Sequence, residues 1–302
     1  TPIIQANLRK MTTATASILK DLKPSTILLL TEPYVSKKHR IPNIPSSHKP
    51  FLSSTGRARS AIIVPQGLHA LSMVLGHYST PDITTIRVTL DTESFILCSA
   101  YLDITTPVDN PVLLDLITHC NLNNIPLVMG SDTNARNTLW NDRLTNSRGR
   151  SLANIIASNS LHIINKGSTP TYQSKLGSSI IDLTITKDYG LNLIDDWSSS
   201  FASTVSDHAR LSFTINLAPP TKLPYRSQKD CDWKLFNDLV THTLTDSPFR
   251  FSPLCDKPYL NKLNSFISNT LIQAYNVACP IKFTSIRSSV PWWNLELTSK
   301  RR

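Results

Sequence analysis

Residues 126–134 read Pro126-Leu127-Val128-Met129-Gly130-Ser131-Asp132-Thr133-Asn134. A short apolar run bounded by turn-forming residues predicts a buried strand. Asp132 and Asn134 follow directly, where such a strand reaches the protein surface. Polar side chains at this position are held by a rigid sheet and still point into a cleft, so the stretch predicts a strand that ends in functional groups.

Many other short segments upstream and downstream also have strand character. Residues 83–90 alternate with the period of two that is typical of a half-buried strand. Further strands are predicted at 3–6, 27–31, 60–64, 71–75, 94–101, 126–130, 180–186, 191–197 and 209–215, and helices at 12–22, 111–120 and 149–158. Because many strands are mixed with few helices, we expect an α+β fold. Its predicted form is a four-layer α/β sandwich of two packed mixed β-sheets flanked by helices.

The chain changes character near residue 218. The stretch Ala218-Pro219-Pro220-Thr221-Lys222-Leu223-Pro224 has linker composition. Two helical stretches follow at 233–244 and 257–278, and the chain ends with a basic terminus at 300–302. We therefore predict one domain at 1–217 and a C-terminal helical extension at 218–302.

Composition limits the class of protein. Of the 302 residues, 40% are hydrophobic and 17% are charged, which is typical of a globular chain. No apolar run is long enough to span a membrane and no signal-peptide layout begins the chain, so we expect no membrane partner. The five cysteines include no Cys-x-x-Cys pair, which disfavours a zinc ribbon and favours a reduced intracellular compartment. The net charge of +10 suits a polyanionic partner, although a solvated basic surface explains the charge equally well.

Polar residues recur at the predicted strand ends. Taken singly, each has an ordinary structural explanation: an Asn after a strand forms turns, and an Asp before one is solvated. Their joint order is the informative property. In chain order they are Asn7, Glu32, Tyr101, Asp132, Asn134, Asp182, Asp207 and His208.

This order resembles the endonuclease/exonuclease/phosphatase superfamily, which includes DNase I, over residues 3–216. The matching motifs are Gln5-Ala6-Asn7-Leu8, Thr31-Glu32-Pro33-Tyr34, Ala100-Tyr101, Gly130-Ser131-Asp132-Thr133-Asn134, Pro170-Thr171-Tyr172, Ile181-Asp182-Leu183 and Ser206-Asp207-His208. Two departures occur in the Gly-Asp-Phe-Asn motif, where Ser131 separates Gly130 from Asp132 and Thr133 replaces Phe. We expect this loop to sit differently against the core.

The resemblance implies roles in phosphodiester hydrolysis. Glu32 and Asp207, helped by Asn7, are expected to bind Mg²⁺, with Mn²⁺ as the alternative. Asp132 would activate or orient the attacking water together with Asn134. His208 would donate to the phosphate while Asp182 holds its ring. Tyr101 would donate a hydrogen bond to the phosphate, and Thr171 and Ser206 would support phosphate binding. The structural alternatives are that Asp182 caps a turn and that Tyr101 is a core aromatic.

Local features are similar to the nicking domains of non-LTR retrotransposons. They are Glu32-Pro33-Tyr34, the segment from Arg57-Ala58-Arg59 to Val64, the segment from Asn134-Ala135 to Trp140, and the tail from Pro291-Trp292-Trp293-Asn294 to Leu297. The similarity implies an endonuclease that nicks double-stranded DNA in the nucleus and leaves a 3′-hydroxyl to prime reverse transcription. The chain is then expected to be the N-terminal part of a longer polyprotein, with element RNA and a reverse transcriptase domain as partners.

Basic side chains near the predicted cleft fit a DNA substrate. Arg57, Arg59 and Arg136 are expected to contact phosphates that flank the scissile one. Two alternatives remain at this stage. One is a phosphatase of the same fold for lipid or inositol phosphates, and the other is a catalytically inactive DNA-binding remnant.

Overall fold

The computed structural model describes residues 1–53, 56–90, 93–187, 193–202, 204–216, 222–247, 249 and 257–285. The chain divides into two compact units, Thr1–Pro220 and Thr221–Arg302. Several predicted features lie outside the described residues: positions 191–192 of one strand, positions 218–221 of the linker, the 291–297 tail and the basic terminus.

The elements of the first unit begin and end close to the predicted positions. Its strands are β1 (Pro2–Asn7), β2 (Ile27–Thr31), β3 (His48–Leu52), β4 (Ser60–Pro65), β5 (Ser72–Val74), β6 (Ile83–Leu90), β7 (Glu93–Tyr101), β8 (Leu127–Asp132), β9 (Leu161–Ile163), β10 (Tyr172–Ser174), β11 (Gly177–Ser179), β12 (Asp182–Lys187), β13 (Ile194–Ser200) and β14 (Arg210–Ile215). Its helices are α1 (Thr12–Lys20), α2 (Gln66–His69), α3 (Pro111–Asn123) and α4 (Ser147–Ser158), with short 3-10 turns at Gly76–Tyr78 and Thr138–Trp140.

Two six-stranded mixed sheets form the body of this unit. Their strand orders are β13-β14-β1-β2-β4-β3 and β5-β6-β7-β8-β12-β9. Each sheet contains one parallel pair, β1 with β2 and β7 with β8, and all other pairs are antiparallel. The parallel pairs are connected through α1 and α3, as parallel strands require.

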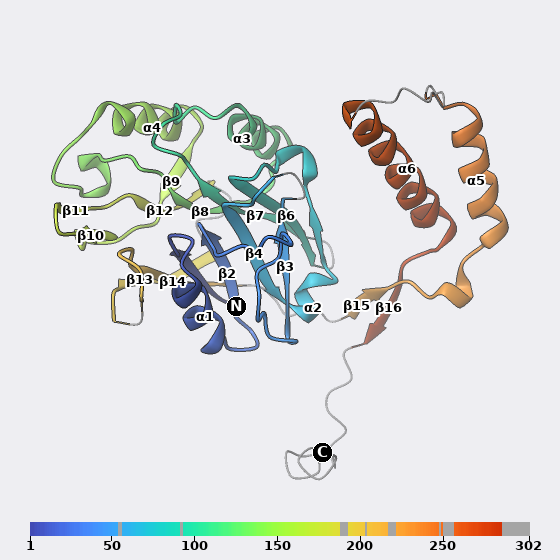
Figure 1. Cartoon of the computed structure of the whole chain (residues 1–302), viewed down its shortest axis with the longest axis horizontal. Coiled ribbons are helices and arrows are strands. Elements are labelled where there is room, and N and C mark those ends of the chain that lie inside the picture. Colours follow the sequence, from blue (N-terminus) through green and yellow to red (C-terminus); the bar gives the residue numbers. More distant parts are fainter. Residues whose placement is uncertain are drawn as a thin grey trace, which may run out of the picture. The chain divides into compact units, whose positions relative to one another are not determined.

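The core has three apolar layers. Residues of β1, β2 and β14 face residues of β6, β7 and β8 between the sheets. A second cluster packs α1 against β2 and β4, and a third packs α3 and α4 against β7, β8 and β12. In Figure 1, α3 and α4 lie along one side of the strands and α1 lies along the opposite side. The predicted sandwich of two mixed sheets with flanking helices is therefore confirmed.

Local sequence explains where the helices begin. The side chain of Asn110 accepts hydrogen bonds from the backbone N–H groups of Val112 and Leu113, and Pro111 occupies the first turn of α3. The side chain of Asn146 caps α4 in the same way by accepting from Gly149 N at 2.7 Å. The Asn110 cap thus fixes the start of α3, and the Asn146 cap fixes the start of α4.

The predictions missed several short strands and placed one strand end too early. Strands β3 and β9 and the β10–β11 hairpin were not predicted. β9, β10 and β11 have three residues each, too few for a visible period, and the five-residue edge strand β3 is interrupted by Pro50. The strand predicted at 126–130 continues to Asp132, since β8 stays paired with β12 up to this residue. Ser131 is fully buried within the ladder, and its hydroxyl donates to Leu183 O at 3.2 Å. The Ser131 insertion thus extends the strand.

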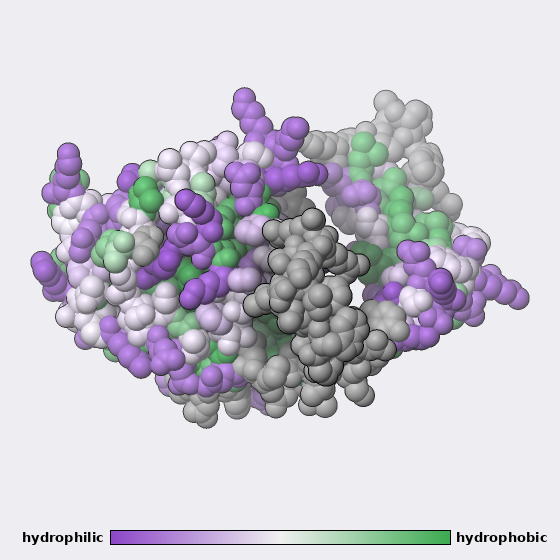
Figure 2. All heavy atoms as spheres, turned by 90° about the horizontal axis from the view of Figure 1, so that it is seen from below, coloured by the Kyte–Doolittle hydropathy of each residue, from purple (hydrophilic) through white to green (hydrophobic). Residues whose placement is uncertain are grey.

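The second unit contains β15 (Lys222–Tyr225), α5 (Trp233–Thr245), α6 (Lys257–Ala278) and β16 (Lys282–Ser285). The two helices were predicted, whereas the antiparallel β15–β16 pair was not. Cys231 and Cys279 are buried together beside Ala278. Figure 2 shows hydrophobic side chains at the surface of this unit. Leu260, Ile267 and Leu271 of α6 are among its exposed apolar residues. Within the described ranges, no helix is long and apolar enough to cross a membrane.

Candidate active site

The ends of several strands place the predicted site residues in one region. Asp132, the last residue of β8, is the register partner of Tyr101 at the end of β7 and of Asp182 at the start of β12. Asn7 ends β1 in the other sheet and is the register partner of Thr31, which precedes Glu32. The site therefore lies where both sheets present strand ends on the same side.

Asp132 is at the centre of a short hydrogen-bond network. Its Oδ2 accepts from Asn7 Nδ2 at 2.7 Å, and its Oδ1 accepts from the backbone N of Asn134 at 3.2 Å. The Asn134 side chain donates to Leu102 O at 3.2 Å, which fixes the amide beside the carboxylate. Burial, followed by the nearby Asp182 charge, raises the pKa of Asp132 to about 7. A carboxylate with this pKa can act as a base near neutral pH.

His208 is held by Asp182. Its Nδ1–H donates to the two carboxylate oxygens of Asp182 at 3.1 and 2.9 Å, and both side chains are buried. Burial lowers the pKa of the imidazole, but the charge and hydrogen bond of Asp182 outweigh that effect and raise this pKa to about 9. The ring is therefore protonated near neutral pH, and its Nε2–H, which lies 4.0 Å from Asp207 Oδ1, can act as a donor. Asp182 does not act as a turn cap.

Thr171 supports the backbone that carries the Asp182 side chain of the Asp182–His208 pair. Its hydroxyl accepts from the backbone N of Ile181 at 3.0 Å and of Asp182 at 2.9 Å, and its carbonyl accepts from Ala209 N at 2.7 Å. The Tyr172 ring packs against the His208 ring with 4.9 Å between centroids. Thr171 is 0% exposed, and its hydroxyl supports the backbone that carries Asp182. Its predicted role in substrate binding stays a prediction.

The Arg59 side chain packs against the Tyr101 ring. The guanidinium lies 4.9 Å from the centre of the Tyr101 ring and forms ion pairs with Asp82 and Asp103. Burial and the charges of Glu32 and Asp132 raise the pKa of Tyr101 to about 12, which keeps the phenol protonated. Both carboxylates engage Arg59, which packs against Tyr101 in this arrangement. Its predicted contact with a DNA phosphate stays a prediction.

The other predicted substrate-binding residues differ in accessibility. Arg57 is exposed, with one hydrogen bond to Val35 O at 3.1 Å, and can meet a phosphate. Arg136 instead forms a bidentate ion pair with the buried Asp142 and donates to Ser178 O, and its predicted contact with DNA stays a prediction. Ser206 is half-buried, and its hydroxyl lies 3.4 Å from Asp207 Oδ1 and accepts from His208 N.

Glu32 and Asp207 each carry an unexpected counter-ion. Lys10 Nζ lies 3.0 Å from Glu32 Oε1, and Arg9 Nη1 lies 2.9 Å from Asp207 Oδ2. Arg9, Lys10 and Glu32 all adopt positive φ (48°, 58° and 46°), a region that costs a residue with a side chain about 1–3 kcal/mol. Strain of this kind at three residues around one cluster points to a functional site. The sequence analysis did not predict the roles of Arg9 and Lys10, although a basic pair separated from Asn7 only by Leu8 was a visible signal.

The donor set suits a divalent cation. Glu32 and Asp207 offer carboxylate oxygens, the ligands that Mg²⁺ prefers, and each already attracts a cationic side chain. A second group, Asp132, Asp182 and His208, has ligand atoms within 4.8 Å of one another and could also hold a metal ion. The site residues thus offer donor groups that fit a divalent metal.

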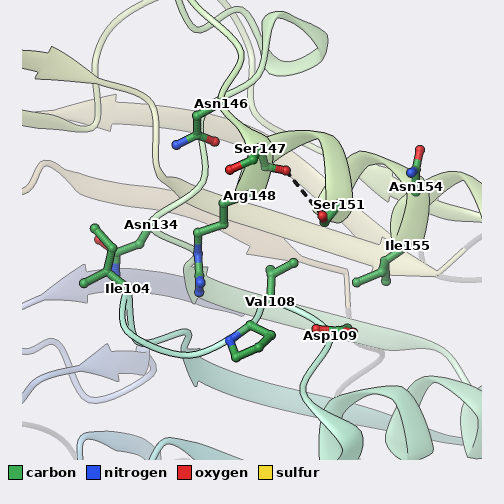
Figure 3. A pocket seen from close by; sticks show the side chains of 11 residues that line it. Ile104, Val108, Asp109, Asn134, Asn146, Ser147, Arg148, Ser151, Asn154 and Ile155 are labelled. Carbon is green, nitrogen blue, oxygen red and sulfur yellow. Dashed lines mark hydrogen bonds between the residues drawn. The ribbon is translucent and has the colours of Figure 1, made fainter.

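A pocket of about 630 Å³ borders the site at Asn134. It runs along the start of α4 and the loop after β7, and Figure 3 shows Arg148 reaching from α4 between Asn134 and Val108. The Arg148 guanidinium donates to Thr133 O and Leu102 O at 2.8 and 2.9 Å. Arg148 therefore connects α4 to both loops that carry catalytic candidates.

Comparison with known proteins supports this arrangement. A family model described as endonuclease-reverse transcriptase matches residues 95–212. The solved endonuclease domain of TRAS1, a telomere-specific non-LTR retrotransposon, superposes with a TM-score of 0.62 at 26% identity, covering 72% of this chain and 99% of that domain. This chain is thus similar to the endonuclease-reverse transcriptase family and has the DNase I-like fold of the endonuclease/exonuclease/phosphatase superfamily. No curated protein matches the sequence.

Two further nucleases show the superfamily fold at low sequence identity. The AP endonuclease LMAP from Leishmania major has a TM-score of 0.58 at 11% identity, covering 72% of this chain and 88% of that protein. The catalytic domain of Xenopus laevis APE2 has a TM-score of 0.51 at 13% identity, covering 71% and 91%. These two comparisons show the shared fold, whereas the family match and the TRAS1 domain support a hydrolase of the nuclease type.

Proposed function

We propose that this chain is a Mg²⁺-dependent endonuclease that nicks double-stranded DNA and leaves a 3′-hydroxyl that primes reverse transcription. The observation that carries the proposal is the convergence of a buried Asp182–His208 pair with Asp132, Asn7 and Asn134 at one sheet end. The match to the endonuclease-reverse transcriptase family and the similarity to the TRAS1 domain favour DNA as the substrate. They also favour a linked reverse transcriptase domain as partner, with element RNA as its template.

The site residues would serve two parts of the reaction: activation of the attacking water and stabilisation of the scissile phosphate. Asp132 accepts a proton from the attacking water while Asn134 orients that water. The new P–O bond forms as the bond from phosphorus to the 3′ oxygen breaks. The His208 imidazolium donates from Nε2 to a non-bridging phosphate oxygen, and the Tyr101 hydroxyl adds a second hydrogen bond. The departing 3′ oxygen takes up a proton from solvent.

We place the metal ion on Glu32 and Asp207, with the Asn7 amide oxygen as a further ligand. An imidazolium has no lone pair for a metal, and the raised pKa of His208 favours this form, so the Asp132–Asp182–His208 group is the poorer metal site. When bound, the cation would neutralise negative charge on the phosphoryl oxygens. Asn7 Oδ1 already accepts from Arg9 N at 2.8 Å and retains a second lone pair.

The two alternative functions receive less support. A catalytically inactive remnant has no need to keep a buried Asp–His pair, which is costly unless both groups are paired. A lipid or inositol phosphatase shares the fold, but the similar structures above are nucleases. We propose that the enzyme acts in the nucleus, where its DNA target lies.

The nature of the nicked end tests this proposal. Supercoiled plasmid is incubated with the chain and Mg²⁺, and the open circles are purified and offered to a DNA polymerase with labelled nucleotides. The proposal predicts direct extension, without prior phosphatase treatment, and no nicking in EDTA. Open circles that are extended only after a 3′-phosphatase has acted would refute the assigned end chemistry. Hydrolysis of inositol phosphates with no DNA nicking would favour the phosphatase.

A further inference from the structure

The turn Leu8–Met11 directly follows the catalytic strand end at Asn7. Met11 N donates to Leu8 O at 2.8 Å, and both central residues, Arg9 and Lys10, have positive φ. Turns of this kind normally carry Asn or Gly at the central positions. Here the site itself fixes the turn, because Arg9 N donates to Asn7 Oδ1 at 2.8 Å and Lys10 N donates to Glu32 O at 2.6 Å. An unfavourable backbone is thus held in place by catalytic candidates.

The consequence of this backbone is the placement of two cations. Lys10 is paired with Glu32 and Arg9 with Asp207, so each proposed metal-binding carboxylate has its own counter-ion. The two carboxylates are 14% and 16% exposed, whereas the Lys10 and Arg9 side chains are 49% and 55% exposed. The carboxylates are therefore fixed in the site, while the cations rest on them from the solvent side and can move away.

A divalent cation and these side chains compete for the same oxygen atoms. Two like charges near one carboxylate repel each other strongly where solvent is partly excluded. The displaced ammonium and guanidinium groups would then stand at the rim of the cleft, where a DNA phosphate offers them new acceptors. Both the metal ion and the DNA would therefore favour the arrangement in which Arg9 and Lys10 have moved away from the two carboxylates.

We propose that the Arg9–Lys10 turn is a counter-ion clamp, which holds Glu32 and Asp207 until a divalent cation replaces it and then binds a DNA phosphate beside the scissile bond. This proposal depends on the metal site at Glu32 and Asp207 that belongs to the proposed function. The clamp lowers metal affinity in the free protein and couples metal binding to DNA binding. Because such coupling is reciprocal, DNA must tighten the metal by the same factor by which the metal tightens DNA.

Mn²⁺ affinity tests the first part of the proposal, that Arg9 and Lys10 compete with the metal ion for the two carboxylates. Titration of the full chain by electron paramagnetic resonance is carried out in a His208→Ala background, which prevents cleavage and leaves the proposed ligands intact. Lys10→Asn and Arg9→Asn remove charge while keeping a residue that tolerates positive φ. Each is expected to bind Mn²⁺ at least about fivefold more tightly than the background protein. Glu32→Gln is expected to abolish this binding, which locates the ion.

Two controls separate the clamp from a general change in charge. Lys20→Asn removes the same charge from the far end of α1, about 12 Å along the helix axis from the turn, and is expected to leave Mn²⁺ affinity unchanged. Lys10→Arg keeps the charge and is expected to bind Mn²⁺ like the background protein. Equal affinity of the background protein and Lys10→Asn, or weaker binding by Lys10→Asn, would overturn the clamp.

The coupling is measured by repeating the Mn²⁺ titration with a saturating short DNA duplex. The background protein is expected to gain Mn²⁺ affinity, and Lys10→Asn is expected to lose most of that gain. An equal gain in both would overturn the coupling. Plasmid nicking by the chain with His208 intact reports on the proposed function separately. Nicking with unchanged Mn²⁺ affinities refutes the clamp alone, whereas the predicted Mn²⁺ shifts without nicking refute the nuclease alone. No Mn²⁺ binding by any variant refutes both.

Discussion

Asp182 lies directly opposite Asp132 in the β8–β12 ladder, yet the two carboxylates have different partners. Asp132 accepts from Asn7 and Asn134, while Asp182 binds the Nδ1 of His208 at 2.9 Å. Two like charges this close cannot both remain ionised cheaply unless one is neutralised. The protonated His208 ring balances the charge of Asp182. The Asp132 carboxyl, whose pKa is raised to about 7, can therefore gain or lose a proton near neutral pH.

Asp182→Asn removes the charge that holds the His208 proton. We expect kcat for plasmid nicking to fall about 10²- to 10⁴-fold, because the ring loses both its orientation and its raised pKa. Binding of DNA in EDTA should change little. Asp115→Asn on the exposed face of α3 is the matched control. A variant that retains more than half of the wild-type kcat would show that Asp182 has no role in positioning His208.

The pH profile of kcat/KM should be bell-shaped. The Asp132 carboxyl must be ionised to accept a proton, so activity is lost as pH falls through about 7. His208 must be protonated to donate, so activity is lost as pH rises through about 9. Because these groups interact, the two limbs report the coupled cluster. Residual activity of His208→Gln should lack the alkaline limb. A wild-type profile that is flat between pH 6 and 10 contradicts these roles.

Thr171→Val tests the hydroxyl beneath the Asp–His pair. The substitution leaves the backbone N–H groups of Ile181 and Asp182 without an acceptor, which should reduce the free energy of unfolding by about 1–3 kcal/mol. It should also lower kcat while leaving KM for DNA nearly unchanged, since the buried residue does not contact substrate. Thr171→Ser keeps the hydroxyl and should restore both. A selective rise in KM would instead support the predicted role of Thr171 in substrate binding.

Gly149 in α4 tests the packing that supports the active-site loop. A Cβ atom at this residue would lie 1.8 Å from Arg136 O, so Gly149→Ala must push the helix and the loop apart. We expect a loss of about 1–3 kcal/mol of stability, despite the better helix propensity of alanine. Gly67→Ala in α2 meets nothing within 4 Å and should be neutral. Thermal unfolding compares the two variants, and equal midpoints would disprove the packing argument.

Sequence periodicity was sufficient for most of the fold. Alternation in 83–90 and the apolar run before Asp132 follow from burial on a sheet, and both strands are present. The β10–β11 hairpin and the β15–β16 pair escaped prediction, because their pairing depends on contacts between segments and on too few residues for a period. Fold class is therefore easier to predict than the short pairings around the site.

The sequence predicted which residues gather at the site, but it was less informative about the role of each residue. The order of motifs suggested Asp182 as the partner of His208, and the side chains lie in contact. The roles of Arg59, Arg136 and Thr171 depend on which acidic group or backbone N–H lies beside them in space. No pattern along the chain reports that Asp142 neutralises Arg136 or that Lys10 rests on Glu32. Charge at a cleft is thus predictable, whereas its availability to DNA is not.

The most direct test of the account is the conversion of supercoiled plasmid to open circles in Mg²⁺ by the wild-type chain and its His208→Ala variant. His242→Ala, at an exposed position of α5, is the matched control. We predict open circles from the wild-type and His242→Ala chains, and a rate at least about 10²-fold lower for His208→Ala. Equal nicking by His208→Ala, or no nicking by the wild-type chain, would contradict the assignment of the Asp182–His208 pair as the core of a nuclease.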